Sequence, residues 1–316
     1  MTLPPGDRPI DLLVVGEINP DVVVTAEDPV PVFGQAERFV DGIRLVPGSS
    51  SVITAMGAAR LGLRVAMVGV VGDDALGRFM LEAMAARGID VSACRVSADR
   101  PTGASVILGN GTDRAILTAA GTIADVRAAD VPPSLLAMAR HLHVGSFFLQ
   151  PGLAAEVPAL FDAAHAAGLT TSLDPNWDPA ERWGGGFAAA ATEADLVLPN
   201  AAEACRLTGL GDPGAAARSL AAGRRTVAVK LGADGALGVG PEGATVRVPA
   251  LPVVPLDTTG AGDSFDAGFL AAWLEGAPLA DALRLAAACG SLSTRAAGGT
   301  DGQATRAEAE AALRPG

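Results

Sequence analysis

The sequence has no tyrosine, and only one of its 23 Lys and Arg residues is a lysine, Lys230. Aromatic residues make up 4% of its 316 residues, whereas apolar residues make up 49%. A core of this composition must be built from Ala, Val and Leu, which suits Ala-rich helices packed on Val-rich strands. The length fits one large α/β domain with a small accessory element.

Positive charge is scarce, because 35 Asp and Glu outnumber the Lys and Arg residues and give a formal net charge of −12. Nucleic-acid binding needs a basic surface, and so does electrostatic docking to an anionic membrane. We therefore expect no nucleic-acid partner and no membrane partner. Any phosphate site must be local, and built from backbone N–H groups with the help of a metal ion.

The three cysteines, Cys94, Cys205 and Cys289, show no CxxC pair and no metal-ligand spacing. They are predicted to be small buried side chains in a reducing compartment. No apolar run reaches the roughly 18 residues of a membrane span. Residues 1–7 lack the charged and apolar regions of a signal peptide. Together these absences predict a cytoplasmic protein.

Short apolar runs alternate with helical patterns along most of the chain. The predicted core strands are residues 10–16, 64–71, 141–144, 170–173, 196–198 and 226–230, followed by a hairpin of 235–239 and 245–248. The predicted helices are residues 50–61, 76–87, 154–167, 187–192, 201–208, 214–222, 262–276 and 278–295. This alternation predicts an α/β fold with a mostly parallel central sheet and helices on both faces. Ligands of such sheets bind at the carboxyl ends of the strands.

Two other regions carry β-branched residues among Pro and Gly and predict a small β-sheet lid. The second contains a hairpin with its turn at Gly109-Asn-Gly-Thr-Asp113. The predicted domains are a large α/β nucleotide-binding domain of residues 1–19, 46–97 and 121–316 and a lid of residues 20–45 and 98–120. The lid would close over a substrate and exclude water. It would either pair with a second copy in a homodimer or remain the lid of a monomer.

The strongest chemical signal is the run Asp257-Thr-Thr-Gly-Ala-Gly-Asp-Ser-Phe265. Gly260, Ala261 and Gly262 precede a predicted helix and let a ligand approach the backbone closely. The N–H groups of the helix's first turn favour an anion there. Asp263 could take a hydroxyl proton while these groups stabilise a transferred phosphoryl group. The alternative is that Asp263 only caps the helix.

This run resembles the C-terminal signature of the ribokinase-like (PfkB) carbohydrate kinase family. Other segments resemble the family's motifs in the family's order: Gly16-Glu-Ile-Asn-Pro-Asp21, Gly69-Val-Val-Gly-Asp-Asp-Ala-Leu-Gly77, Asp174-Pro-Asn176, Leu198-Pro-Asn-Ala-Ala-Glu203 and Lys230-Leu-Gly-Ala-Asp-Gly235. The resemblance covers nearly the whole chain. It implies a ribokinase-like fold and an ATP-dependent transfer of the γ-phosphoryl group to a hydroxyl of a sugar or sugar-like molecule.

The resemblance also implies a role for the residues of the central run. Asp263 would be the catalytic base, and Gly260, Ala261 and Gly262 would form the anion hole. Asp257 and Thr259 match positions that in some relatives bind K+, which makes K+ a candidate cofactor beside ATP and Mg2+.

Other implied roles concern the nucleotide. Asn200 and Glu203 would organise Mg2+ through water, since Mg2+ keeps much of its water shell. The alternative for this pair is a helix-start Asn and a solvated Glu. Lys230, Gly232 and Gly235 would line the ATP loop, although Lys230 could equally be an ordinary lysine at a strand end.

The substrate end is predicted around Asn19 and Asp21, which would face the same side of an extended segment. An amide beside a carboxylate suits sugar hydroxyls, which donate and accept hydrogen bonds; a polar turn is the alternative. Gly48, Ser49 and Ser50 are further substrate candidates. Many family members have Gly-Gly-x-x-x-Asn in this stretch, and the change of the second Gly and the Asn puts ribose in doubt.

In this chain Ser49 replaces that second Gly and Ile53 replaces the Asn. A phosphorylated sugar would need cationic side chains near the lid, for which the candidates are Arg38, Arg44, Arg100 and Arg114.

Two other enzyme classes fail on their motifs. A nicotinamide dehydrogenase needs G-x-G-x-x-G after its first strand, where this chain has Gly16-Glu-Ile-Asn. A Walker P-loop needs Lys followed by Ser or Thr, and Lys230 is followed by Leu. A nucleoside kinase of the same family and a non-catalytic relative that binds ATP and sugar remain the alternatives.

Overall fold

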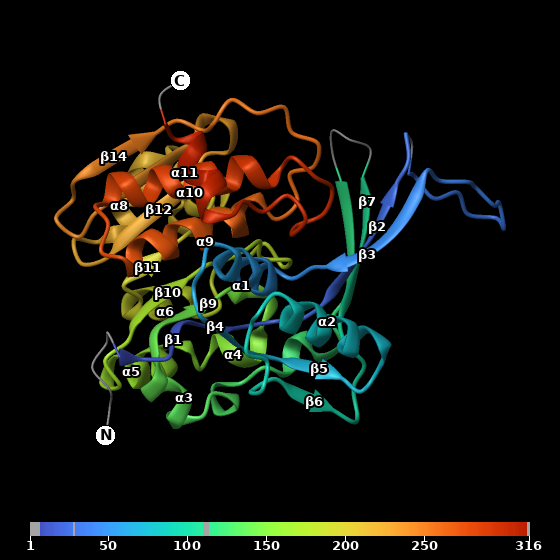
Figure 1. Ribbon diagram of the computed structural model, residues 1–316, viewed down its shortest axis with the longest axis horizontal. Coiled ribbons are helices and arrows are strands. Elements are labelled where there is room, and N and C mark those ends of the chain that lie inside the picture. Colours follow the sequence, from blue (N-terminus) through green and yellow to red (C-terminus); the bar gives the residue numbers. More distant parts are fainter. Residues whose placement is uncertain (1–6, 28, 110–113, 315–316) are drawn as a thin grey trace.

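Buried parallel strands form the centre of the molecule, which Figure 1 shows in a view down its shortest axis. The computed structural model describes residues 7–27, 29–109 and 114–314, without the side chain of Arg114. Within these residues eight strands form one sheet in the order β14-β13-β12-β11-β10-β9-β1-β4. The strands are β1 (Ile10–Val15), β4 (Val65–Val68), β9 (Ala139–Val144), β10 (Thr170–Leu173), β11 (Leu196–Val197), β12 (Thr226–Lys230), β13 (Ala236–Val239) and β14 (Thr245–Val248). In this order all neighbouring strands from β12 to β4 pair in parallel, whereas β13 pairs antiparallel with both β12 and β14.

Helices cover both faces of this sheet, as predicted, because alternate side chains of each strand point to opposite faces. Leu12 and Val14 of β1 belong to one apolar core, and Leu13 and Val15 belong to the other. The first core is closed by α1 (Ser50–Arg60), α2 (Ala75–Ala86), α9 (Ala261–Leu274), α10 (Leu279–Ser293) and α11 (Arg306–Ala312). The second is closed by α3 (Pro133–Met138), α4 (Pro151–Ala154), α5 (Val157–Ala166), α6 (Phe187–Glu193), α7 (Ala201–Thr208) and α8 (Pro213–Ala221). Short 3-10 helices span Gly121–Asp125, Ala128–Asp130, Phe147–Leu149 and Gly232–Asp234.

A second, smaller sheet projects from one side of the molecule, at the right of Figure 1. It is formed by β2 (Pro20–Thr25), β3 (Gly42–Pro47), β7 (Ala104–Gly109) and β8 (Arg114–Ala119) in the order β3-β2-β7-β8. The pair β2–β7 is parallel, and the two outer pairs are antiparallel. The small sheet was expected, although residues 110–113 of the predicted turn and residues 1–6 lie outside the described residues. The exact domain boundaries remain a prediction.

Two predicted elements are wrong in their extent. The strand predicted over 64–71 is divided into β4 and β5 (Val70–Gly72), and β5 pairs with β6 (Arg95–Ser97) in a separate two-stranded sheet. Between them lies Gly69, where an added Cβ would lie 2.5 Å from the carbonyl oxygen of Gly16. Here the chain passes closely over the end of β1 and leaves the main sheet. The helix predicted over 154–167 begins later, as α5 at Val157, and a separate short helix, α4, ends at Ala154.

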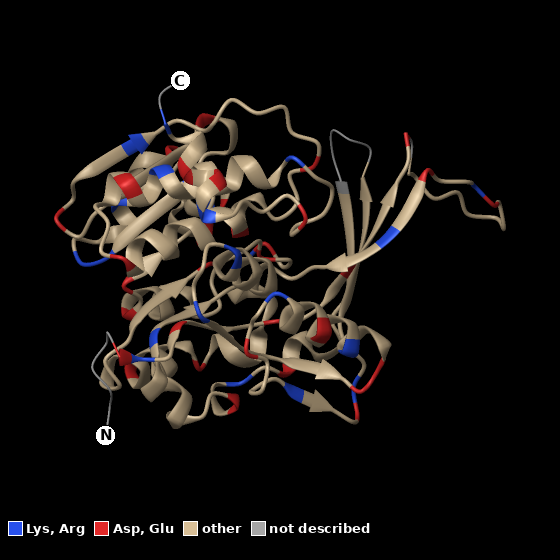
Figure 2. Ribbon diagram, in the orientation of Figure 1, with Lys and Arg blue, Asp and Glu red and all other residues tan. Residues whose placement is uncertain are grey.

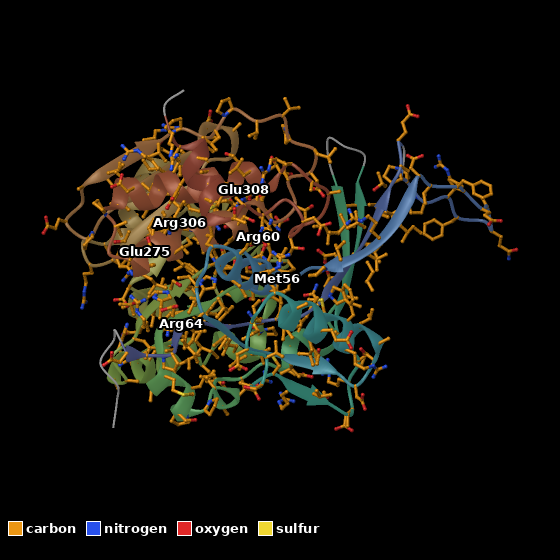
Figure 3. The ribbon with its side chains drawn as sticks, in the orientation of Figure 1. Met56, Arg60, Arg64, Glu275, Arg306 and Glu308 are labelled. Carbon is orange, nitrogen blue, oxygen red and sulfur yellow. The ribbon has the colours of Figure 1, made fainter. Side chains whose placement is uncertain are left out.

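The C-terminal helix α11 was not predicted from the sequence. Thr305 and Glu308 form a capping box at its start, and Arg306 binds Glu275 at the end of α9 through two contacts of 2.8 Å (Figure 3). Acidic and basic residues are interspersed along the ribbon in Figure 2. None of the described helices is long and apolar enough to span a membrane.

Candidate active site

Polar side chains gather where the carboxyl ends of the parallel strands meet the start of α9. They line a cavity of about 720 Å³ that also reaches the small sheet. The predicted site residues on this cavity are Asn19, Asp21, Ser49, Ser50, Asn200, Glu203, Lys230, Gly232, Thr259, Gly260, Gly262 and Asp263. The topology thus brings together residues that are up to 244 positions apart (19 to 263), at the edge where an α/β sheet binds its ligands.

The first turn of α9 has the geometry of an anion site. Its N-cap is Gly260, which has a φ of 70° and no side-chain cap. Only glycine fits this position, because an added Cβ would lie 2.7 Å from Cα of Gly299. The carboxylate of Asp263 does not cap the helix, which excludes the simple capping alternative. The N–H of Ala261 donates to the carbonyl oxygen of Thr258 over 3.3 Å. The N–H groups of Gly262 and Asp263 in this turn have no acceptor within the helix and can serve a ligand.

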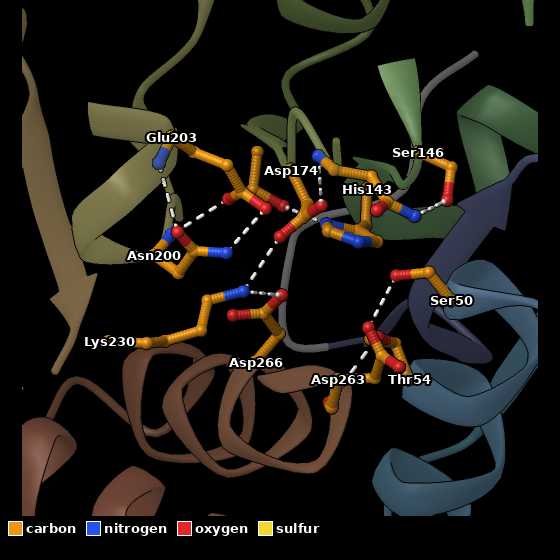
Figure 4. Close-up of polar contacts among 12 residues, drawn as sticks. Ser50, Thr54, His143, Ser146, Asp174, Asn200, Glu203, Lys230, Asp263 and Asp266 are labelled. Carbon is orange, nitrogen blue, oxygen red and sulfur yellow. Dashed lines mark hydrogen bonds and ion pairs between the residues drawn. The ribbon is translucent and has the colours of Figure 1, made fainter. Parts of the chain in front are cut away.

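Asp263 lies in the same first turn and is half-buried at the edge of the cavity (Figure 4). The hydroxyl of Ser50 donates a hydrogen bond to its carboxylate, and Thr54 donates to its carbonyl oxygen over 3.3 Å. Burial raises the pKa of Asp263 to about 7; the Ser50 hydrogen bond opposes the rise, the charge of Asp174 adds to it and Lys230 lowers it. A carboxylate with this pKa is suited to accept a proton near neutral pH.

Lys230 ends β12 and extends between two carboxylates (Figure 4). Its Nζ donates to Asp174 over 2.7 Å and to Asp266 over 2.8 Å. Burial disfavours the ammonium, but the charges of Asp174 and Asp266 outweigh this and raise the pKa of Lys230. Burial also raises the pKa of Asp266 well above its usual range, against the opposing charge of Lys230. Lys230 is therefore not an ordinary exposed lysine, and Asp266 is a partner that sequence reasoning missed.

Asn200 and Glu203 form the capping box of α7. Asn200 accepts a hydrogen bond from the N–H of Glu203 over 2.9 Å, and Glu203 accepts one from the N–H of Asn200 over 2.8 Å. The expected helix-start Asn is therefore present, but the solvated Glu is wrong, since Glu203 is buried. Burial and the charge of Asp174 raise the pKa of Glu203 to about 7. A nearby cation would stabilise the charged form of such a carboxylate.

Carboxylate and amide oxygens are the donors that Mg2+ prefers, so this corner of the cavity fits the ion chemically. In the described part of the chain, no three His, Cys, Asp or Glu side chains are grouped to hold a metal by themselves. A Mg2+ ion would therefore take most of its ligands from phosphate and water.

A second cavity of about 400 Å³ lies on the other side of Lys230. Leu251, Val253 and Phe265 contribute apolar walls, and Gly235 lines it as predicted. Lys230, Gly232, Thr258 and Gly262 line both cavities, so the two share a wall at the start of α9. An apolar slot that opens onto an anion site suits a nucleotide, with its base in the slot and its phosphates at the wall.

The end of the larger cavity at the small sheet contains Asn19 and Asp21, both nearly fully buried. The amide of Asn19 lies 3.5 Å from the hydroxyl oxygen of Ser105 in β7. A Cβ added to Gly48 would lie 2.2 Å from a carboxylate oxygen of Asp21. Gly48 therefore leaves the space that Asp21 occupies, which explains why this position is small.

Ser49, Ser50 and Ser51 are where this chain departs from the related motif. Ser49 has a φ of 68°, a left-handed conformation that glycine adopts without strain. Its hydroxyl donates to the carbonyl oxygen of Glu17 over 2.6 Å, and Ser51 donates to the Glu17 carboxylate over 2.6 Å. Ser146 donates to the same carboxylate over 2.8 Å. Of the three serines, only Ser50 binds Asp263.

Glu17 itself was not predicted as a functional residue. It is 1% exposed, and burial raises its pKa despite the hydrogen bonds from Ser51 and Ser146. In the sequence Glu17 and the serines at 49–51 are 32 to 34 positions apart, so no local pattern could have indicated this cluster.

Asp257 accepts hydrogen bonds from the backbone N–H groups of Thr259 and Gly298, each over 2.8 Å. These contacts hold the loop that enters α9.

A family comparison agrees with this geometry: the model of the pfkB family carbohydrate kinases matches residues 10–306. The chain belongs to this family. It is 34% identical to a fructokinase of Klebsiella pneumoniae over 80% of this chain and 87% of that protein. It is 31% identical to an ATP-dependent ribose-1-phosphate kinase of Halopiger xanaduensis over 90% of this chain and 92% of that protein.

Among solved structures, a fructokinase from Vibrio cholerae O395 with fructose, ADP and calcium ion bound superposes with a TM-score of 0.81, at 25% identity, over 98% of this chain and all of that chain. The predicted ribokinase-like fold and the kinase class, a phosphotransferase with an alcohol acceptor, are therefore confirmed. The roles of individual residues in this PfkB kinase stay predictions.

Because Asp263 can take a proton only when it is deprotonated, we expect kcat/KM to rise with pH and to level off above about 7. The groups that act on its charge are Ser50, Asp174, Lys230 and Glu17. In the Ser50→Ala variant the hydrogen bond that lowers the pKa of Asp263 is lost, so the midpoint of the profile should move to higher pH. A pH–rate profile of both enzymes checks this, and an unchanged midpoint would show that Asp263 is not the titrating base.

The substitution Gly48→Ala should displace the carboxylate of Asp21 and raise the KM of the acceptor about tenfold or more, since one lost charged hydrogen bond costs about 1.5–3 kcal/mol. The KM of ATP should stay the same. Gly42→Ala at the start of β3, the strand that ends just before Gly48, is the matched control, because its added Cβ meets nothing within 4 Å. Steady-state kinetics on both variants give the KM of the acceptor and of ATP. Equal changes in the two KM values would show that Asp21 does not bind the acceptor.

Proposed function

We propose that this PfkB kinase transfers the γ-phosphoryl group of ATP to a hydroxyl of an uncharged sugar-like molecule bound beneath the small sheet. The observation that carries the proposal is the position of Asp263 and the N-terminal turn of α9 where the two cavities meet. A nucleotide in the smaller cavity and an acceptor in the larger one would both reach this point.

In this reaction the acceptor hydroxyl donates its proton to Asp263 as its oxygen bonds to the γ-phosphorus. The backbone N–H groups at Gly260, Ala261 and Gly262 stabilise the charge on the phosphoryl oxygens, because they are fixed in place before the reaction. Water is excluded if the small sheet closes over the acceptor.

Two ions fit this scheme as cofactors. A bound Mg2+ would neutralise charge on the ATP phosphates, and Asn200 and Glu203 would hold it through water. Asp257 and Thr259 remain the proposed K+ site, where an ion would have to share oxygens that already accept backbone N–H groups. The related fructokinase structure with ADP and calcium ion bound supports a divalent ion as cofactor.

The charge around the acceptor favours an uncharged molecule. Glu17, Asp21 and Asp263 all line the larger cavity, and Lys230 is the one basic residue among its described lining. Arg44 instead pairs with Asp301 over 2.6 Å.

Two of the other predicted cationic candidates, Arg38 and Arg100, also have partners away from the larger cavity. Arg100 pairs with Asp125 over 3.1 Å, and Arg38 donates to the carbonyl oxygen of Val30 over 2.9 Å. The side chain of Arg114 is outside the described part. A neutral sugar, as in the two related fructokinases, therefore fits better than a sugar phosphate or sugar acid.

A nucleoside is the second candidate acceptor. Ile53, Ile107 and Trp177 give the larger cavity an apolar wall that a base could contact, and Ile53 stands where many relatives have a sugar-binding Asn. A non-catalytic relative that binds ATP and sugar remains the alternative to both. A cytoplasmic location also stays a prediction.

Release of ADP from MgATP in the presence of neutral sugars, sugar acids, sugar phosphates and nucleosides tests the proposal. We expect turnover with a neutral acceptor, and we expect Asp263→Asn to lower kcat at least 100-fold, since a positioned base contributes about 10²–10⁴ in rate. Turnover that survives Asp263→Asn would contradict the mechanism. Turnover only with phosphorylated or acidic acceptors would contradict the acceptor class, and ATP binding without any turnover would support the non-catalytic alternative.

We also propose a homodimer formed through the small sheet. Asp21 pairs with Ser105, and Ser105 pairs with Thr118, and all three line the larger cavity on one face of the sheet. The residues between them point to the other face. That outer face is apolar: Val22, Val24, Ile43, Leu45, Val106, Leu108 and Leu117.

Ile43, Leu45 and Leu117 are 66%, 42% and 63% exposed, which is unusual for apolar residues that share one sheet face. A second copy of the same face would cover them with a self-complementary surface. This is why a dimer is favoured over a monomer with an exposed lid.

Leu45→Glu should therefore convert the dimer to a monomer, because it places a charge in the apolar contact. Leu210→Glu is the matched control, since Leu210 is 40% exposed and lies outside the small sheet. Light scattering after size-exclusion chromatography measures the mass of each form. A monomeric parent protein, or a dimer that survives Leu45→Glu, would contradict this interface.

A further inference from the structure

The single lysine of the chain stands on the wall between the two cavities. Lys230 lines both of them, as does Gly262 in the first turn of α9. A Cβ added to Gly262 would lie 3.7 Å from Nζ of Lys230. The ammonium therefore lies directly beside the backbone of the predicted anion hole.

Two carboxylates hold the Lys230 ammonium, and one of its hydrogen-bond donors is not used by them. It has three N–H donors, and the described residues accept two of them through Asp174 and Asp266. The side chains of these two residues are 5% and 0% exposed, whereas that of Lys230 is 12% exposed. The cation is thus the member of the cluster that a ligand can reach, and it has one donor left.

No other basic residue lines either cavity among the described residues. The surroundings are acidic instead, with Asp174, Glu203 and Asp263 on the larger cavity. Negative charge that arrives with a phosphoryl group therefore meets one fixed protein cation. A cation that is already in place needs no rearrangement as charge develops, which is the arrangement that stabilises a transition state most.

We propose that Lys230 is a catalytic residue whose free N–H binds an oxygen of the γ-phosphoryl group during transfer, and that Asp174 and Asp266 are positioning residues that hold it there. This rests on the proposed phosphoryl transfer. The acceptor oxygen bonds to the γ-phosphorus and gives its proton to Asp263, while the bond from the γ-phosphorus to the bridging oxygen breaks and its electron pair stays on ADP. Lys230 keeps its proton throughout and contributes charge alone.

Asp266 gives this proposal an element that an ordinary phosphate-binding lysine lacks. It belongs to α9, three residues after Asp263, so one helix carries the base and an anchor of the cation. Its Oδ1 is buried without a hydrogen-bond partner among the described residues, while its Oδ2 accepts from Lys230. Because Oδ2 of this buried carboxylate accepts from Lys230 over 2.8 Å, Asp266 fixes the ammonium relative to the anion hole.

The experiment compares the parent enzyme with Lys230→Met, Lys230→Arg and the double variant Lys230→Met with Asp266→Asn. The double variant avoids leaving two buried carboxylates without a cation, which could itself prevent folding. Arg64→Met is the control, because it breaks the 2.8 Å contact to Asp11, and neither residue lines either cavity. Each protein is measured for kcat with the best neutral acceptor, for Kd of MgADP and of the MgATP analogue AMP-PCP, and for Tm.

We expect both Lys230→Met proteins to lose about 100-fold or more in kcat, with the Kd of MgADP changed by less than about threefold. The affinity for AMP-PCP, which carries a γ-phosphoryl group, should fall more than the affinity for MgADP. Lys230→Arg should recover part of kcat, because it keeps the charge. Arg64→Met should leave kcat unchanged.

Two results would overturn the proposal. A lower Tm with unchanged kcat in the folded fraction would make Lys230 a structural ion-pair partner only. An equal loss of affinity for MgADP and AMP-PCP, with kcat unchanged, would show that Lys230 is a general nucleotide contact. If the parent enzyme phosphorylates no acceptor, the proposed function fails, and the ratio of the two affinities still decides whether Lys230 binds the γ-phosphoryl group.

Discussion

The site depends on one interaction, the contact of the Lys230 ammonium with Asp174 and Asp266. It connects β12, the loop after β10 and α9, three segments that meet only through the long-range topology of the sheet. Removing the cation would leave buried carboxylates that repel each other and Asp263. The start of α9 is thus fixed against the sheet by a charge cluster in addition to apolar packing.

This constraint accounts for how an acidic chain handles an anionic nucleotide. The net charge of −12 excludes a general basic surface, and the molecule instead presents backbone N–H groups and a single ammonium at one point. The hydroxyls of Ser49, Ser50 and Ser51 serve the neighbouring carboxylates, two of them at Glu17 and one at Asp263. The serine run therefore supports two acids that line the larger cavity, Glu17 and Asp263.

The sequence predicted those features that neighbouring residues determine. The strands of the main sheet, the glycines before α9 and the Asn200 cap depend on local composition and were placed correctly, apart from the split at Gly69. That split arises because the chain passes over Gly16, 53 residues earlier. The contacts of Ser50 with Asp263 and of Lys230 with Asp266 span 213 and 36 residues, and no local pattern encodes them. Glu17 escaped notice for the same reason, since its burial depends on serines from two distant loops.

The central claim is that the acceptor hydroxyl, the γ-phosphoryl group and Asp263 align at the start of α9. The most direct measurement is a crystal structure with Mg2+, ADP, aluminium fluoride and the neutral acceptor, in which the fluoride takes the place of the phosphoryl group in transfer. The account predicts the fluoride at the N–H groups of Gly260 and Gly262, within hydrogen-bond distance of Lys230, and the acceptor oxygen against Asp263. A fluoride bound away from this turn, or an acceptor whose hydroxyl faces away from Asp263, would contradict it.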